Sequence, residues 1–332
     1  MKIGLLYSRI RTDEKLLLSE LRERDHDVEK IDVRKQQFAV GGAPEVFDDL
    51  DIVVDRCLST SRSVYATKFA RAYDVPVING PDVAEICADK VKNSLALVEA
   101  GVPTPDTDVA FTKDAALESI ERFGYPCVLK PVVGSWGRLM AKVDSRDAAE
   151  AILEHKATLG HYEHKVFYVQ EFVDKPGRDI RVLATDGEPV AAMCRSSDHW
   201  LTNAAKGAET DTFELDDRAL ELVEKASAAV GGGLLGIDLM EVGVSEDSEA
   251  QRASGDASSA ERSSANRSSG QSPRDDGDEP RAPEPDDYTV HEVNHTVEFK
   301  ALNEVADVDV PGEVVDWLES KAQSESGAET PT

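Results

Sequence analysis

The sequence predicts an α/β protein in which a small parallel-sheet unit is followed by larger α+β lobes. In the first 84 residues, short apolar runs alternate with stretches of helix length, which is typical of a parallel sheet covered by helices. In the later part, several strand-like runs surround one long helical stretch. A chain of 332 residues can also bury the cores of two or three lobes.

Residues 1–84 form the first predicted domain. The expected strands are Lys2–Tyr7, Asp51–Val54 and Val75–Ile78, and the expected helices are Asp13–Arg24 and Ser63–Tyr73. The turn sequence Asn79-Gly80-Pro81 ends this unit.

Residues 85–321 form the second predicted domain, with a lobe of its own at about 105–170. Its expected helices are Pro81–Ala100, Ala115–Phe123, Arg146–Leu159 and Leu215–Val230. Its expected strands are Cys127–Lys130, Val166–Phe172, Arg181–Ala184, Val190–Cys194, Leu234–Glu241 and Tyr288–Val293.

One long segment is predicted to be disordered. Residues 245–287 contain ten Ser, twelve acidic and five basic residues, and no large apolar residue. Such a stretch cannot bury enough apolar surface to offset the entropy of ordering it. Because it lies between two expected strands, we place it at the tip of a hairpin, where a long loop adds little closure entropy. We expect it to carry no chemistry. The tail at 322–332 is predicted to be disordered as well.

The charge of the chain excludes several kinds of partner. Acidic residues outnumber basic ones 65 to 37, which gives a formal net charge of −28. Such a surface repels phosphate backbones and anionic lipids, so we expect no nucleic-acid or membrane partner. The acid excess is spread along the chain, as in halophilic proteins of molar salt, although an ordinary acidic protein has the same property. The first residues enter a strand pattern without a signal peptide, so we expect a cytoplasmic protein.

The most informative pattern is a set of oxygen donors on two late strands. Asp238 lies in Leu-Leu-Gly-Ile-Asp, and Glu292 and Asn294 are two residues apart, so that both project from one face of a strand. If the two strands pair, the three side chains form an oxygen set that suits Mg²⁺ with phosphate ligands. A polar, solvent-facing side of a strand pair would give the same spacing.

Two lysines and a glycine loop add a phosphate site to this pattern. Lys90 follows an aspartate in a helix, and Lys130 ends an apolar strand just before Pro131. The loop that follows contains Gly134 and Gly137, which allow a close approach of backbone N–H groups to phosphates. The loop matches neither the P-loop nor the Rossmann glycine pattern.

A third element is the strand Tyr168–Val173, which ends in the polar pair Gln170 and Glu171. Backbone groups at a strand edge can bind an adenine, and a carboxylate suits ribose hydroxyls. An edge strand capped by polar residues explains this pattern equally well.

Together these elements occur in the order and spacing of ATP-grasp enzymes. The resemblance covers nearly the whole chain apart from the insertion and the tail. It is closest to the branch with the ribosomal-protein glutamate ligases and, more narrowly, to the LysX/ArgX ligases that act on the amino-group carrier protein LysW. The stretches that carry it are Gly4–Arg11, Val128–Leu139, Lys175–Arg181, Arg195–Trp200 and Glu292–Phe299.

The resemblance implies a site with four groups of residues. The ATP-binding residues would be Lys90, Lys130, Gly134, Ser135, Trp136, Gly137, Arg138, Leu139, Met140, Gln170, Glu171, Phe172, Val173, Asp179, Arg181, Asn203 and Ala205. The catalytic pair would be Arg195 and Lys206. Substrates would contact these two residues together with Gly207, Glu298, Phe299, Lys300, Ala301 and Leu302. The Mg²⁺ ligands would be Asp238, Glu292 and Asn294.

The resemblance also implies the reaction: ATP and Mg²⁺ activate the C-terminal glutamate side chain of a LysW-type carrier as an acyl phosphate, and the amine of glutamate or 2-aminoadipate attacks it. Relatives usually carry arginine at the position of Lys206, and lysine lacks its bidentate fork. At the positions of Ala301 and Leu302, relatives specific for 2-aminoadipate carry Asn and a small residue, and relatives specific for glutamate carry Gly and Phe. A small residue followed by a bulky apolar one is nearer to Gly-Phe, so we favour glutamate as the acceptor. Glutamate ligation on a ribosomal-protein tail and a non-catalytic ATP-binding module remain as alternatives. We also expect a homo-oligomer.

Overall fold

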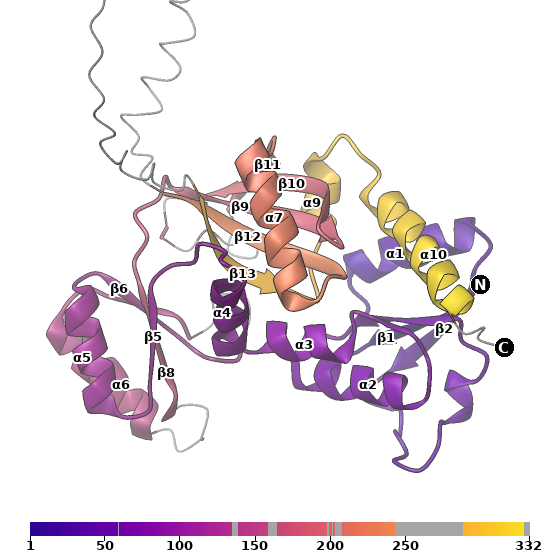
Figure 1. Ribbon diagram of the computed structural model, residues 1–332, viewed down its shortest axis with the longest axis horizontal. Coiled ribbons are helices and arrows are strands. Elements are labelled where there is room, and N and C mark those ends of the chain that lie inside the picture. The colour runs from indigo at the N-terminus through magenta and orange to yellow at the C-terminus, as the bar shows by residue number, and fades with distance from the viewer. Residues whose placement is uncertain are drawn as a thin grey trace, which may run out of the picture.

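The computed structural model describes residues 1–58, 60–134, 139–158, 165–197, 199–200, 202, 208–242 and 288–328. The disordered insertion predicted at 245–287 therefore lies outside the described residues. Three sheets, each with its own helices, follow one another across the molecule (Figure 1). No helix in this described part of the chain is both long and apolar enough to cross a membrane.

The N-terminal sheet is parallel, as predicted. Its order is β2–β1–β3–β4, with β1 (Lys2–Tyr7), β2 (Asp27–Asp32), β3 (Ile52–Arg56) and β4 (Val77–Ile78). Helices α1 (Thr12–Glu23) and α2 (Thr60–Ala72) cover opposite faces, because Ile3 and Leu5 point to one side of β1 and Leu6 to the other. The domain limit predicted at residue 84 stays a prediction.

The central sheet is antiparallel and carries the two strands that were predicted to hold the oxygen donors. Its order is β11–β10–β9–β12–β13, with β9 (Arg178–Thr185), β10 (Glu188–Ser196), β11 (Glu209–Thr212), β12 (Leu234–Glu241) and β13 (Tyr288–Asn294). The pairing of β12 with β13 is confirmed, with Asp238 opposite Glu292 and Gly236 opposite Asn294. Helix α7 (Asp217–Val230) packs on the far face, where Leu222 and Ala226 meet Ile237 and its neighbours.

A third sheet forms a separate lobe, which we call the lid lobe. Its order is β5–β8–β6–β7, with β5 (Thr107–Ala110), β6 (Cys127–Lys130), β7 (Ala141–Val143) and β8 (Phe167–Glu171). Helices α5 (Lys113–Phe123) and α6 (Arg146–Thr158) cover one face and share a core with it, centred on Ile120, Leu129 and Val169. Figure 1 shows this lobe at the opposite end of the molecule from the N-terminal sheet.

The chain enters and leaves the lid lobe at adjacent points. Thr107 pairs with Gln170 across β5 and β8. The backbone N–H of Asp106 donates to the Glu171 carboxylate at 2.8 Å, and the Glu171 N–H donates to the Asp106 carbonyl at 2.9 Å. Both connections to the rest of the protein therefore meet at one hinge.

The single helix predicted over Pro81–Ala100 is in fact two helices, α3 (Pro81–Ala88) and α4 (Lys90–Glu99). Asp89 lies between them in extended conformation, and its side chain accepts from the N–H of Val91 at 2.8 Å. Aspartate is a favoured N-cap because it satisfies N–H groups that have no partner inside the helix. The break places Lys90 at the start of α4.

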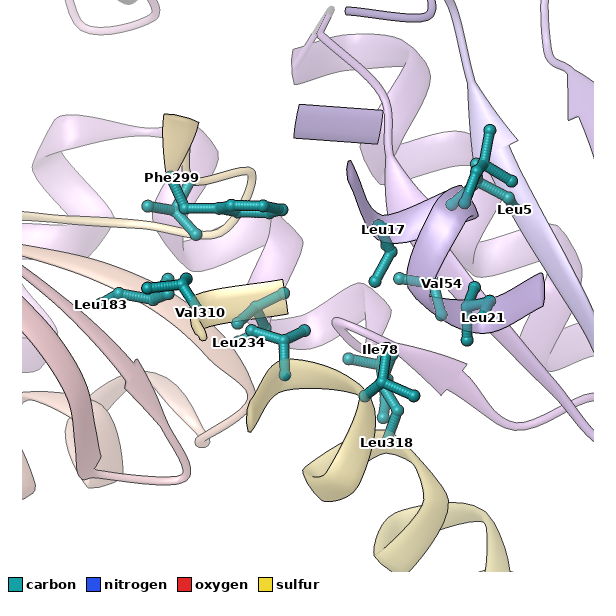
Figure 2. Packing of buried hydrophobic residues seen from close by; sticks show 14 of the residues in the cluster. Leu5, Leu17, Leu21, Val54, Ile78, Leu183, Leu234, Phe299, Val310 and Leu318 are labelled. Atoms are coloured by element: carbon teal, nitrogen blue, oxygen red, sulfur yellow. The ribbon is translucent and has the colours of Figure 1, made fainter. Parts of the chain in front are cut away.

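A continuous apolar core joins the N-terminal sheet to the central sheet; we call it the inter-sheet core. Helices α9 (Lys300–Val305) and α10 (Val310–Ala328) contribute to it. Figure 2 shows side chains of this core from both sheets, from α1 and α10 and from the residue before α9, including Leu5, Leu17, Leu21, Val54, Ile78, Leu183, Leu234, Phe299, Val310 and Leu318.

The prediction that the tail is disordered from residue 322 onward is wrong for residues 322–328, which continue α10. The reason is packing: Ala322 is 2 % exposed and belongs to the inter-sheet core, so the helix gains apolar contacts beyond Lys321. The last residues, 329–332, lie outside the described part.

Candidate functional site

A cavity of about 640 Å³ lies between the central sheet, the lid lobe and the N-terminal domain. Seventeen of the predicted site residues line it, and they come from segments that are far apart in the sequence. They are Lys90, Lys130, Gly134, Met140, Gln170, Glu171, Phe172, Val173, Asp179, Arg181, Arg195, Asp238, Glu292, Asn294, Glu298, Lys300 and Ala301.

Three predicted residues do not line the cavity. Leu139 is 72 % exposed, and Phe299 and Leu302 are fully buried in the inter-sheet core. Helix α9 explains the last case, because residues 300, 301 and 304 share the face toward the cavity and 302 points the opposite way. Eight further predicted residues lie outside the described part of the chain: Ser135, Trp136, Gly137, Arg138, Asn203, Ala205, Lys206 and Gly207.

Asp238 is the centre of the charged network on the floor of the cavity. Arg181 donates to its two carboxylate oxygens at 2.5 and 2.7 Å, and Arg195 Nη2 donates to Oδ1 at 2.8 Å. Asn294 Nδ2 lies 3.2 Å from Oδ2. Burial alone would raise the pKa of Asp238, but the two arginines hold it well below its ordinary value. The carboxylate is therefore ionised throughout the physiological pH range.

Glu292, opposite Asp238 on β13, accepts from Lys90 Nζ at 2.5 Å. Lys90 Nζ also donates to the carbonyl of Gly134 at 3.1 Å, which ties the start of α4 to the segment after β6. An aspartate, a glutamate and an asparagine thus meet on adjacent strands with nearby cations.

This donor set fits a hard divalent cation. Two carboxylates and one amide oxygen are too few to enclose an ion, and the described residues contain no group of three His, Cys, Asp or Glu side chains arranged to hold one. Mg²⁺ needs no such cage, because it keeps waters and takes further ligands from nucleotide phosphates. Asp238, Glu292 and Asn294 are the residues that would hold it.

Lys130 reaches the same site from the lid lobe. Its side chain is buried at the end of β6, and its ammonium group donates to the Gln170 amide oxygen and lies 3.2 Å from His291 Nε2. Burial lowers the pKa of Lys130 to about 7. Anionic phosphates in the cavity would favour its charged form.

Gln170 orients Lys130 rather than offering a free edge to a base. Its amide nitrogen donates to Thr107 Oγ1 at 2.8 Å and to the Tyr168 hydroxyl at 3.1 Å, and Tyr168 in turn lies 2.8 Å from Ser94 Oγ on α4. These hydrogen bonds connect the lid lobe to the helix that carries Lys90. Glu171, predicted to bind ribose, lines the cavity with its carboxylate already bonded at the hinge.

His291 is a cavity residue that sequence reasoning missed. It lies at a β-bulge, since Asp238 pairs with Glu292 whereas Leu239 pairs with Val290. The extra residue breaks the alternation of β13, so that His291 and Glu292 both line the cavity. Burial holds the pKa of His291 well below its ordinary value, so the ring is neutral beside Lys130. No pattern in the sequence marks the bulge.

Arg11, Thr12 and Asp13 of the N-terminal domain also line the cavity and were not predicted as site residues. Their only signal in the sequence is that Arg11 ends the stretch Gly4–Arg11, which carries the resemblance, and that Thr12 and Asp13 follow it. Thr202 was missed as well, whereas Lys175 lies in the stretch Lys175–Arg181 that carries the resemblance; Lys175 Nζ donates to Thr202 Oγ1 at 2.8 Å.

Comparisons with known proteins agree with this geometry. Residues 3–86 match the LysX preATP-grasp domain, and residues 87–246 match the RimK-like ATP-grasp domain. The alpha-aminoadipate–LysW ligase LysX of Sulfurisphaera tokodaii is 34 % identical over 243 residues, which cover 73 % of this chain and 85 % of that protein. The glutamate–LysW ligase ArgX of Sulfolobus acidocaldarius is 31 % identical over the same shares.

Solved structures show the same fold. A RimK-domain ATP-grasp protein from Sphaerobacter thermophilus superposes with a TM-score of 0.71 at 24 % identity, over 96 % of this chain and 99 % of the other. The D-alanine–D-alanine ligase of Bacillus anthracis in complex with ATP gives 0.67 at 14 % identity, over 99 % and 100 % of the two chains.

Proposed function

This chain belongs to the LysX/ArgX family of ATP-grasp ligases, and from that membership we propose that it ligates a dicarboxylic amino acid to a LysW-type carrier protein. The bond would be an amide between the side-chain carboxylate of the carrier's C-terminal glutamate and the α-amine of free glutamate. The class of the enzyme, an ATP-dependent carboxylate–amine ligase, follows from the family.

One observation carries the proposal: Asp238, Glu292 and Asn294 lie together on adjacent strands, with Lys90 and Lys130 beside them. A module that only binds nucleotide would not need to keep this whole arrangement. When bound there, Mg²⁺ would neutralise negative charge on the nucleotide phosphates.

The residues of the chain would divide the remaining work between them. Lys90 and Lys130 would contact the phosphates from two sides, one from α4 and one from the lid lobe. They would stabilise the charge that spreads over the γ-phosphoryl group as the carrier's carboxylate attacks it. Arg195, already fixed by Asp179 at 2.6 Å and by Asp238, would face the reacting carboxylate.

The lid lobe would protect the acyl phosphate from water. Gly134 and Met140 line the cavity, and both belong to the lobe that hinges at Asp106 and Glu171. Closure of this lobe on ATP would exclude water, so that the amine, rather than a hydroxide, reacts with the activated carboxyl. No nucleophile from the enzyme is required.

The acceptor is proposed to be glutamate rather than 2-aminoadipate. Ala301 lines the cavity, whereas its neighbour Leu302 is fully buried in the inter-sheet core. Of the two positions that separate the branches by resemblance, only 301 can therefore touch the amino acid. Alanine there offers no amide to a substrate, which favours the glutamate branch.

A mass measurement tests the proposal directly. The protein is mixed with ATP, Mg²⁺, a LysW-type carrier and either glutamate or 2-aminoadipate in molar KCl, and the carrier is weighed by mass spectrometry. We expect the carrier to gain one glutamyl residue, faster than one aminoadipyl residue. A carrier whose C-terminal glutamate is replaced by glutamine is the control and should gain nothing.

Other results would decide against the proposal. If a ribosomal-protein tail gained mass when it replaced the carrier in the mixture, and the carrier itself did not, the alternative ligase activity would be correct. If ATP bound without turnover in any mixture, the chain would be a binding module.

A further inference from the structure

The wall of the cavity opposite the phosphate lysines is built by the N-terminal domain and α9. Arg11, Thr12, Asp13 and Leu58 line it from one side, and Lys300, Ala301 and Glu304 from the other. The Mg²⁺ and phosphate residues proposed above do not use this wall.

Arg11 is held at this wall by a buried partner. Its Nε and Nη2 atoms donate to the two carboxylate oxygens of Glu14 at 3.0 and 2.7 Å, and Glu14 is fully buried. The remaining nitrogen, Nη1, donates to Glu298. The side chain of Glu298 is 42 % exposed, against 15 % for Arg11. Glu14 is thus a fixed partner and Glu298 a partner that can leave.

Arg11 and a second arginine, Arg56, meet at the buried Glu14 carboxylate. Arg56 is fully buried and shares the Glu14 carboxylate at 3.2 Å. Its Nη2 donates to the Val297 carbonyl, and its Nη1 has no hydrogen-bond partner among the described residues. Both arginines therefore contact Glu14. Asp13 adds a second buried negative charge that raises the pKa of Arg11, and Glu298 is the partly exposed carboxylate in contact with Arg11.

The other carboxylates of this wall have partners of their own: Glu304 pairs with Lys300 at 3.4 Å, and Asp13 binds backbone groups. Asp13 Oδ1 accepts from the backbone N–H groups of Phe299 and Lys300 at 2.7 and 2.8 Å, which fixes the start of α9. The charge of Asp13 raises the pKa of Arg11, but its hydrogen bonds go to this backbone. A carboxylate that entered the cavity would displace only Glu298.

We propose that Arg11 binds the side-chain carboxylate of the acceptor amino acid, and that Glu298 occupies this position until the amino acid arrives. This inference rests on the proposed function, because it takes a dicarboxylic α-amino acid as the ligand. The amine must reach the carboxyl that is activated beside the phosphate lysines, so the side-chain carboxylate extends toward the opposite wall. The side chain of Glu298 is itself a chemical copy of glutamate's.

Binding measurements test this assignment without the carrier. L-glutamate and L-glutamine are each titrated by calorimetry into the full chain with Mg²⁺ and a non-hydrolysable ATP analogue. Arg11→Gln should weaken glutamate binding about 10- to 100-fold, as expected when a charge-assisted hydrogen bond is lost, and glutamine binding about two-fold at most. Arg24→Gln, which removes a cation paired with Glu20 and Asp316 at the other end of α1, is the matched control and should change neither.

Two further variants keep the test independent of folding. Arg11→Lys keeps the charge but loses the planar guanidinium, which can bind a carboxylate through two N–H groups. Its affinity for glutamate should therefore lie between those of the wild type and Arg11→Gln. Glu298→Gln alters a half-exposed side chain and should bind glutamate several-fold more tightly, because the competing carboxylate is gone.

Several results would overturn the assignment. Equal weakening of glutamate and glutamine in Arg11→Gln would do so, as would weaker glutamate binding in Glu298→Gln. A wild-type chain that binds neither glutamate nor 2-aminoadipate would overturn it too. A chain that binds glutamate through Arg11 but transfers none to the carrier would refute the proposed function alone.

Discussion

Replacing Asp238 by asparagine should reduce both stability and ATP turnover, for two separable reasons. The carboxylate accepts two hydrogen bonds from Arg181 and one from Arg195, and it is nearly inaccessible to solvent. Removing one partner of a buried ion pair leaves uncompensated charge and costs about 3–5 kcal/mol. The neutral amide of the variant would also be a poor ligand for Mg²⁺, and a loss of several kcal/mol of charge stabilisation corresponds to a turnover at least about 100-fold lower.

A second ion pair on the same two strands provides the matched control. Arg178 of β9 donates to both oxygens of Glu241 on β12, at 2.6 and 2.9 Å. Neither residue lines the cavity, because both side chains lie on the face opposite Asp238. Glu241→Gln should cost about 1–3 kcal/mol, less than the first variant because the Arg178 side chain is 30 % exposed and can be hydrated. Its ATP turnover should stay within about two-fold of the wild type.

The assay combines urea denaturation in molar KCl with ADP release at saturating carrier and glutamate. Both variants are compared at a temperature where each is fully folded. If Glu241→Gln lost as much turnover as Asp238→Asn, general destabilisation would explain both results. If Asp238→Asn turned over ATP at the wild-type rate, Asp238 would have no place among the metal ligands.

Three further outcomes are expected. Leu318→Ala should lower the unfolding free energy by about 3 kcal/mol, because Leu318 is fully buried in the inter-sheet core. Leu220→Ala, at a position that is 39 % exposed, should lower it by less than about 1 kcal/mol. Denaturant titration measures both values, and equal losses would contradict the shared core. Burial would raise the pKa of Glu14, but two arginines lower it below its ordinary value of about 4.3. The contribution of Glu14 to the unfolding free energy is therefore present above that pH and is lost on acidification. Glu14→Gln should flatten the fall of stability between about pH 5 and pH 3 in urea titrations. Gln170→Met removes a hydrogen-bond acceptor from Lys130 and should raise KM for ATP about 2- to 10-fold in steady-state kinetics, an effect that an unchanged KM would exclude.

The parts of the fold that sequence reasoning predicted best are strands buried on both faces. The limits of Cys127–Lys130 and Leu234–Glu241 agree with the structure to the residue, because each is a run of buried side chains that starts beside a proline or a glycine. Asp27–Asp32 was missed, since four of its six residues are charged and it forms an edge strand. Helix α10 was missed because its first turn contains Pro311 and Gly312, the two residue types with the lowest helix propensity.

The site was predictable where its residues follow the period of one strand. Glu292 and Asn294 are two residues apart and line the cavity as expected. His291 could not be predicted, because its position depends on a bulge that only the pairing with β12 creates. Arg11 could not be predicted either, since its contact with Glu298 joins residues 287 positions apart and depends on how the N-terminal domain packs on α9.

The position of the hinge has a consequence for how the protein tolerates change. The lid lobe has a core of its own and is joined to the rest through neighbouring residues at Asp106 and Glu171, whereas the N-terminal and central sheets are joined by the inter-sheet core. Topologically the lobe is a domain inserted at one point of a host. Its fluctuations, local unfolding and accumulated mutations can therefore be largely confined to it, as in a cooperative unit that opens on its own. The half of the site with Asp238 and Glu292 would keep its geometry throughout.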